Sequence, residues 1–348
     1  MMAQSEFFAE LDRRNAEKTS EILSGLPMMV TDYFRSRKAN TTARTRLSYA
    51  YDLRLFFDWL VSIRKLNDRQ EASSVNVEDL RTLTARDIET FLEYLETDKD
   101  RANSKYGMAR KYACLSSFFD YLCRNDWLPA NPCSKVIPVK PDRDERIIRL
   151  APEEVVRFLD AIEYTQGMFT EKQKKFLART AVRDLAIAAM LLGTGIRVSE
   201  LVGLNLSNIY LDKCQVSVYG KGGKYRTVPL GDETIDMLMP YLEQRKTITP
   251  SLPEDADAVF LSSQRRRMCI QAVEDMISKY ASAIGVQDRI TPHKLRKTYG
   301  TELYEETGDI FLVAQSLGHN NVNTTRNHYV ASDEEKLLAA RNKVKLRK

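Results

Sequence analysis

Apolar residues recur at the three-to-four-residue spacing of one-sided helices through the first 130 residues of the chain. The three stripes consist of Ala50, Leu53, Phe57 and Leu60, of Ile88, Phe91, Leu92 and Leu95, and of Leu115, Phe118, Phe119 and Leu122. Polar groups able to cap a helix precede the first stripe at Asn40–Thr42 and the second at Thr84–Asp87. The pattern predicts an all-helical N-terminal region whose third helix runs from about Ser104 to Cys123.

A proline-rich, charged segment from Asn131 to Leu150 follows this helical region. Its composition disfavours a continuous helix and a buried face, so we expect a linker between two domains. Ala151–Glu154 then begins a new helix, because proline is tolerated in the first turn and acidic residues suit its positive end. A helix through Asp184–Leu192, a hairpin around Gln215–Leu230 and further helices complete a mainly α second domain with a small β-sheet, an α+β fold.

Length and composition indicate an ordinary globular protein. The 348 residues fit two domains at about 150 residues each, and 43% are apolar and 29% charged. No stretch approaches the roughly 18 apolar residues of a membrane span, and the charged start Met1–Asn15 does not resemble a signal peptide. The five cysteines form no C-x-x-C pair, which argues against a disulfide framework or a zinc knuckle. We therefore expect a cytoplasmic protein without a membrane partner.

The distribution of charge is more informative than the net charge of +5. Residues 51–100 hold 7 basic and 12 acidic side chains, whereas residues 101–150 hold 10 and 5, so the net charge changes from −5 to +5. Such a swing is typical either of a face that binds a polyanion or of ordinary solvated helices. The candidate phosphate-binding residues are Arg44, Lys105, Arg110, Lys111 and Lys224.

Two segments of the second region place basic residues at turns. Arg197 follows a glycine turn at the start of a helix, where it can either bind an anion or form a salt bridge with Glu200 or Asp184. Lys221 and Lys224 lie in the turn of the predicted hairpin, where they can either reach a ligand or remain solvated. No phosphate-binding glycine motif of a nucleotide-hydrolysing enzyme is present, so ATP-driven chemistry is not supported.

All three histidines, His293, His319 and His328, lie within 36 positions. Pro292 predicts a helix start, and the spacing of three places His293 and Arg296 on one helical face. An arginine at the second ligand position would repel a metal ion, so we expect no metal and no cofactor.

Arginines, a lysine and histidines without paired carboxylates are suited to stabilising a phosphate whose charge grows during reaction. Tyr329, the last tyrosine of the chain, is the candidate nucleophile, since no serine elbow or nearby thiol is available. A phosphotyrosyl ester would conserve the energy of the phosphodiester bond, so that a strand could be cut and rejoined without ATP.

This constellation resembles the tyrosine recombinase (phage integrase) family. The residues that match the motifs of the family are Arg197 in R-V-S-E-L, Lys221 in G-K-G-x-K, His293 and Arg296 in H-x-L-R, His319 in L-G-H, and Tyr329. The similarity is strongest to Xer-type recombinases of the lone-acting kind, with an insertion at Thr165–Val182. Two positions depart from the family pattern: Lys297 replaces a frequent histidine, and the spacing from His319 to Tyr329 is one residue longer, so that His328 could occupy the usual histidine position.

The resemblance implies a domain plan with a helical, SAM-like core-binding domain before the catalytic domain. The expected segments are an N-terminal extension (1–25), the core-binding domain (26–134), a linker (135–150), the catalytic domain (151–335) and a basic tail (336–348). Such tails dock on a neighbouring protomer in this family, although a frayed end is an equal alternative for Lys336–Lys348.

The resemblance also implies the roles of the residues. Arg197, Arg296 and His319 would bind the scissile phosphate, and Tyr329 would form a 3′-phosphotyrosyl link. Lys221 would protonate the leaving 5′-oxygen, with Lys224 as the alternative, and His293 would assist proton transfer.

The expected partners are double-stranded DNA with a specific recombination site and three further copies of the chain, which would form a homotetramer on two duplexes. An accessory protein is a further candidate partner, and the expected location is the cytoplasm, in association with the nucleoid. The implied role is chromosome dimer resolution or the integration and excision of a mobile element. A DNA-binding protein without chemistry and a type IB topoisomerase-like enzyme are the less favoured alternatives.

Overall fold

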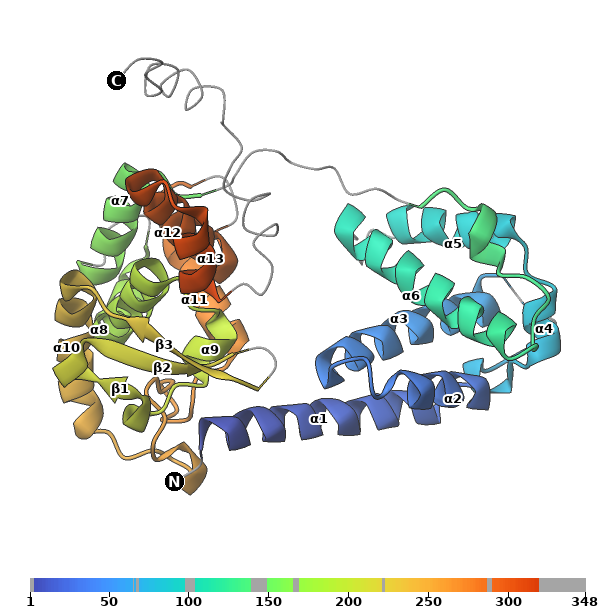
Figure 1. Cartoon of the computed structure of the whole chain (residues 1–348), viewed down its shortest axis with the longest axis horizontal. Helices are drawn as coiled ribbons and strands as arrows, with labels where there is room; N and C mark the ends of the chain where they lie inside the picture. Colours follow the sequence, from blue (N-terminus) through green and yellow to red (C-terminus); the bar gives the residue numbers. More distant parts are fainter. Residues whose placement is uncertain are drawn as a thin grey trace, which may run out of the picture. The chain divides into compact units, whose positions relative to one another are not determined.

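The computed structural model describes residues 3–64, 66, 69–97, 104–138, 149–164, 169–220, 223–286 and 290–318. The chain forms two compact units, one of residues 1–7 with 144–348 and one of residues 8–143 (Figure 1). We describe each unit separately.

Every element of regular secondary structure among the described residues of the unit 8–143 is a helix, as the apolar stripes predict. Its helices are α1 (Gln4–Ser24, which begins in the other unit), α2 (Met28–Arg37), α3 (Ala43–Ser62), α4 (Val77–Arg81), α5 (Ala85–Thr97) and α6 (Lys105–Arg124). Both predicted capping signals are present. The Thr42 hydroxyl accepts a hydrogen bond from the Thr45 backbone N–H at 3.1 Å, and the Asp87 carboxylate accepts one from the Thr84 backbone N–H at 2.9 Å. The members of all three predicted stripes are buried in one shared core.

One expectation about this unit is wrong: the segment that begins at Asn131 does contribute to the core. Pro132–Lys135 forms a short 3₁₀ helix, and both Cys133 and Val136 are buried. The Tyr112 hydroxyl donates a hydrogen bond to the Cys133 carbonyl oxygen at 2.9 Å. Proline at the first position of a short 3₁₀ turn needs no N–H partner, so this composition still permits two buried side chains. Residues 139–148 of the predicted linker lie outside the described residues.

The other unit combines helices with a three-stranded antiparallel sheet of order β1-β2-β3. Its elements are α7 (Pro152–Glu163), α8 (Glu171–Thr194), α9 (Val198–Val202), β1 (Ile209–Tyr210), β2 (Gln215–Tyr219), β3 (Tyr225–Pro229), α10 (Asp232–Lys246), α11 (Ile270–Ala283), α12 (Pro292–Thr307) and α13 (Ile310–Leu317). The predicted helix starts at Ala151–Glu154 and Pro292 and the predicted hairpin are confirmed.

Helix α8 is the central element of this unit, since it packs against α7, α10 and α12. It is longer than the predicted Asp184–Leu192, because Thr170 caps it and Glu171 begins it. The part of the expected insertion that lies from Glu171 to Val182 is therefore the first half of the same helix.

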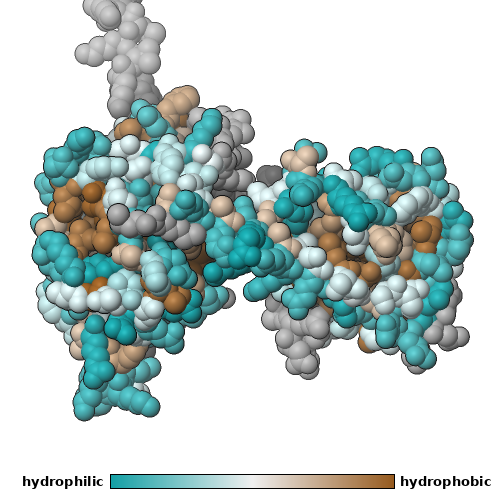
Figure 2. Space-filling view, turned by 90° about the horizontal axis from the view of Figure 1, so that it is seen from below, coloured by the Kyte–Doolittle hydropathy of each residue, from teal (hydrophilic) through white to brown (hydrophobic). Residues whose placement is uncertain are grey.

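Viewed from below, the surface is mainly hydrophilic, with apolar patches separated by polar side chains (Figure 2). Among the described residues, no helix is long and apolar enough to cross a membrane.

Candidate active site

The turn between α8 and α9 requires glycine at position 195. Gly195 ends α8 with φ of +61°, a left-handed conformation that strains other residues. A Cβ at this position would lie 2.3 Å from Cδ1 of Tyr299 and 2.9 Å from Cδ2 of Leu317. The turn therefore packs closely against α12 and α13. Two residues later, Arg197 is the N-cap residue of α9.

Arg197 is held by Glu200 and by the end of α13. Its backbone N–H donates to Oε2 of Glu200 at 2.9 Å, and its Nη1 donates to Oε1 at 3.0 Å. Its Nη2 donates to the carbonyl oxygen of Gly318 at 3.3 Å. The salt bridge named as one alternative therefore forms, and 32% of the Arg197 side chain remains exposed.

Arg296 on α12 is bound to the same two turns. Its Nη1 donates to the carbonyl oxygen of Gly195, and its Nη2 donates to that of Leu317. Arg296 is buried, with 3% of its surface exposed. Two guanidinium groups from segments about a hundred residues apart thus meet where the α8–α9 turn contacts the end of α13.

His293 lies one helical turn before Arg296, at the beginning of α12, and is exposed. Pro292 occupies the first position of the helix, and Thr291 caps it by accepting a hydrogen bond from the Lys294 N–H. The predicted relation of His293 to Arg296 along the helix is present, with the arginine buried and the histidine at the surface.

Glu200 is the centre of an ion cluster that also contains Arg226. Nη1 and Nη2 of Arg226 donate to Oε1 and Oε2 of Glu200 at 2.7 and 2.9 Å. Burial by itself would raise the pKa of Glu200, but the hydrogen bonds and charges of Arg226 and Arg197 hold it below its ordinary value. Glu200 is therefore a buried, ionised carboxylate at neutral pH.

Arg226 was not singled out by sequence reasoning. It lies on β3 and is half-buried, on the same side of the strand as the buried Val228. A basic residue at an inward position of an alternating strand was the available signal.

The hairpin between β2 and β3 places Lys224 at the surface. Its carbonyl oxygen accepts a hydrogen bond from the Gly220 N–H at 2.9 Å, which closes the turn. Lys221, His319, His328 and Tyr329 lie outside the described residues.

The candidate phosphate-binding residues of the helical unit lie on α3 and α6. Arg44 and Lys105 are exposed. Nη1 of Arg110 is bound to the buried Asp52 at 2.6 Å, so this guanidinium group is partly engaged within the unit. Burial raises the pKa of Asp52 to about 6, although the charges of Arg110 and Lys111 act in the opposite direction.

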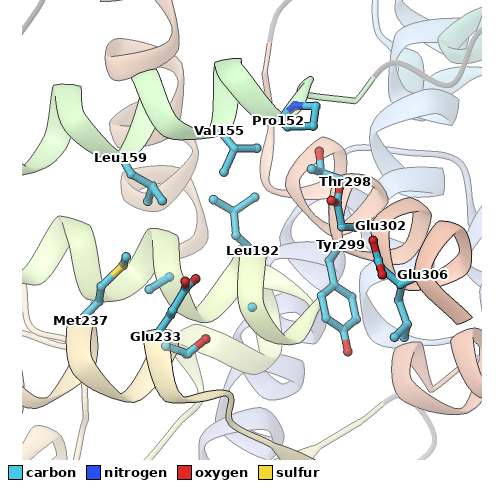
Figure 3. A pocket seen from close by; sticks show the side chains of 14 residues that line it. Pro152, Val155, Leu159, Leu192, Glu233, Met237, Thr298, Tyr299, Glu302 and Glu306 are labelled. Carbon is cyan, nitrogen blue, oxygen red and sulfur yellow. The ribbon is translucent and has the colours of Figure 1, made fainter.

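A cavity of about 450 Å³ lies between α7, α8, α10 and α12 (Figure 3). Its lining is mainly apolar, and Tyr299 contributes one wall while its hydroxyl is hydrogen-bonded to Ser316 at 2.7 Å. Arg197, His293 and Arg296 are not part of this lining. The cavity is therefore separate from the cationic site.

The chemistry available at the cationic site is anion binding. Within the described ranges no group of three or more His, Cys, Asp or Glu side chains could hold a metal ion. Arg197 retains exposure next to the buried Arg296, and the two can provide several N–H donors to a phosphate oxygen.

Known proteins are similar to this chain in sequence. Residues 149–336 match the model of the Phage integrase family. The chain is 31% identical to tyrosine recombinase XerS of Streptococcus uberis, over 92% of this chain and 96% of the relative. It is 29% identical to XerS of Streptococcus thermophilus, with the same coverage.

Solved structures share the architecture. XerH site-specific recombinase bound to a palindromic difH substrate matches with a TM-score of 0.65 and 18% identity, over 98% of this chain and 97% of that one. A lambda integrase dimer bound to a core site matches with a TM-score of 0.59 and 17% identity, over 85% and 95%. The predicted fold class is confirmed. The family match over more than half of its length and the 31% identity to XerS show that the chain belongs to the phage integrase family and is a tyrosine recombinase of the Xer type.

Proposed function

We propose that Arg197 and Arg296 bind the non-bridging oxygens of one DNA phosphate and that Tyr329 attacks its phosphorus. The observation that supports this assignment is the meeting of both guanidinium groups at the Gly195 turn and the end of α13. Positive charge placed before the reaction stabilises the pentacoordinate transition state, in which negative charge accumulates on these oxygens.

The proposed reaction is balanced without ATP. The Tyr329 oxygen forms a bond to phosphorus, the bond from phosphorus to the 5′-oxygen breaks, and Lys221 or Lys224 donates a proton to that oxygen. His319 adds a hydrogen bond to the phosphate, and His293 accepts the phenol proton as the Tyr329 oxygen attacks. The 5′-hydroxyl of a partner strand then attacks the phosphotyrosine and restores a phosphodiester.

We further propose that the chain acts as a homotetramer on two duplexes, exchanges strands through a Holliday junction, and resolves chromosome dimers. The similarity to XerS over 92% of the chain supports this role over mobile-element integration. XerH and lambda integrase have been solved on recombination-site DNA, which supports duplex DNA as the partner. The exposed basic residues Arg44 and Lys105, with Lys111, are the proposed phosphate contacts of the helical unit.

The decisive experiment measures covalent adduct formation by the full chain. A duplex selected from genomic fragments by binding to the chain is nicked near the cleavage position, so that the released 5′ end diffuses away and the adduct accumulates. We expect the wild type to form the adduct in the presence of EDTA and Tyr329→Phe to bind the same DNA without forming it. Tyr304→Phe, which alters a different tyrosine of the same unit, is the matched control.

Binding without any adduct in the wild type would instead support a DNA-binding protein without chemistry. Relaxation of supercoiled plasmids that lack the selected site would support a topoisomerase. An adduct formed by Tyr329→Phe would refute the assignment of the nucleophile.

A further inference from the structure

We propose that Arg226 is a positioning residue for the reaction, which fixes the direction of Arg197 through the carboxylate of Glu200. This inference rests on the proposed function, because it assumes that Arg197 binds the scissile phosphate. Arg226 itself would not touch the DNA.

The first argument is the geometry of the shared carboxylate. Oε1 of Glu200 accepts from Nη1 of Arg197 and from Nη1 of Arg226, while Oε2 accepts from the Arg197 backbone N–H and from Nη2 of Arg226. Each carboxylate oxygen therefore binds both arginines. The two-pronged contact of Arg226 defines the plane of the carboxylate, and that plane determines where Nη1 of Arg197 can lie.

The second argument is that Arg226 is anchored more firmly than Arg197. It is the second residue of β3, paired with Val218 of β2, and only 20% of its side chain is exposed. Arg197 is the N-cap of the five-residue helix α9 and keeps 32% exposure. Because a flexible arginine has several rotamers of similar energy, an ion pair to a fixed strand limits them.

The third argument is that Arg226 fills the space between the segments of the site. A Cβ on Gly318 would lie 2.9 Å from its Nε, and one on Gly220 would lie 3.3 Å from its Nη1. Gly318 is also the residue whose carbonyl oxygen accepts from Nη2 of Arg197. Arg226 thus binds Glu200 and lies beside Gly318, the two residues that hold the Arg197 side chain.

Arg226 is poorly suited to bind phosphate directly. Both of its terminal nitrogens donate to the carboxylate of Glu200, so its positive charge already has a counterion, whereas the terminal nitrogens of Arg296 donate to neutral backbone carbonyl oxygens. Its Nε is buried, and it has no hydrogen-bond partner among the described residues. The side chain of Arg226 is also less exposed than that of Arg197, 20% against 32%.

The test compares three chemical forms of the scissile linkage in the nicked duplex. A methylphosphonate removes one negative charge and so reduces the need for a correctly placed guanidinium group. A 5′-bridging phosphorothiolate has a sulfur leaving group that needs no proton, so it restores variants that lack the general acid. An ordinary phosphodiester is the reference.

We expect Arg226→Gln to slow adduct formation on the phosphodiester by about 10²-fold, the cost of a small misplacement of a reacting group. On the methylphosphonate the deficit relative to wild type should shrink to about tenfold or less, since the misdirected charge is no longer required. The phosphorothiolate should leave the deficit unchanged. Arg226→Lys, which keeps one charged donor for Glu200, should lose less. Arg266→Gln, an exposed arginine of the same unit, is the control.

The proposal would be overturned by an equal deficit on all three linkages, by wild-type rates on the phosphodiester, or by restoration on the phosphorothiolate. Restoration on the phosphorothiolate would indicate that Arg226 positions the general-acid lysine of the hairpin and not Arg197. If Arg226→Gln does not melt cooperatively, the same comparison with Arg226→Lys decides. Absence of any adduct with the wild type would contradict the proposed function rather than this inference.

Discussion

Glu200 shows how a single buried carboxylate can organise a cationic site. With 2% of its side chain exposed, it would be costly as an ion without partners. Four hydrogen bonds to the carboxylate, two from Arg197 and two from Arg226, make the ionised form the stable one. The carboxylate in turn keeps two arginines close together despite their mutual repulsion.

Removal of this carboxylate should therefore destabilise the unit. We expect Glu200→Ala to lower the free energy of unfolding by about 2–4 kcal/mol, below the full cost for a wholly buried pair because both arginines are partly solvated. Urea unfolding at pH 7 measures the change. Glu243→Ala removes the exposed partner of Lys246 and should cost less than about 1 kcal/mol; equal losses in the two variants would contradict the buried role of Glu200.

At the scale of elements, the α8–α9 turn brings the site together. We expect Gly195→Ala to cost at least about 2 kcal/mol, since a left-handed alanine is strained and its Cβ would overlap the Tyr299 ring. The variant should also form less adduct, because the Gly195 carbonyl oxygen binds Arg296. Gly231→Ala is the control, with no atom within 4 Å of the added Cβ. Equal melting temperatures for the two variants would show that the turn tolerates a side chain.

The contact between α3 and α6 should make the helical unit sensitive to pH. The pKa of Asp52 is raised by burial from 3.8 to about 6, so the folded unit keeps a proton that the unfolded chain has lost. The contribution of Asp52 to stability therefore falls as the pH rises from about 4 to about 6. Asp52→Asn cannot ionise, and its partner Arg110 is 44% exposed and can be solvated.

We accordingly expect Asp52→Asn to gain stability relative to wild type between pH 4 and pH 7, as measured by urea unfolding at both pH values. Asp58→Asn, which alters an exposed ion pair with Arg54, should show no such gain. A difference between Asp52→Asn and wild type that stays constant with pH would argue against the raised pKa.

At the scale of the whole molecule, binding to DNA should depend on charge contributed by the helical unit. Each phosphate contact that is lost reduces the slope of log affinity against log salt by about 0.9. We expect Lys105→Gln combined with Lys111→Gln to reduce the slope by about 2, measured by gel shift between 50 and 200 mM salt, about the range over which counterion release is usually followed. Lys246→Gln should leave it unchanged. An unaltered slope in the double variant would place the phosphate contacts elsewhere.

Much of the architecture was predictable, because periodicity and capping act over a few residues. The stripe from Leu115 to Leu122, the cap at Thr42 and the proline at the start of α12 each appear where the pattern placed them. The burial of Cys133 and the full length of α8 were not predicted, since both depend on the neighbouring elements that pack against these residues. The order of motifs also led to the right family, which the match over residues 149–336 confirms.

The hydrogen-bond partners and the exposure of the side chains in the cationic site could not be predicted from the local sequence. The contacts that define the cationic site join Arg197 to Gly318, 121 residues away, and Arg226 to Glu200, 26 residues away. Arg110 and Asp52, 58 residues apart, meet in the same manner. A pattern along the chain shows which residue types recur and at what spacing. The packing of distant elements determines the direction of each side chain and which donor binds a buried acceptor. For this reason the linear motifs were sufficient to recognise a recombinase, whereas the tertiary structure was needed to show that Arg226 and Arg197 bind the same carboxylate, that of Glu200.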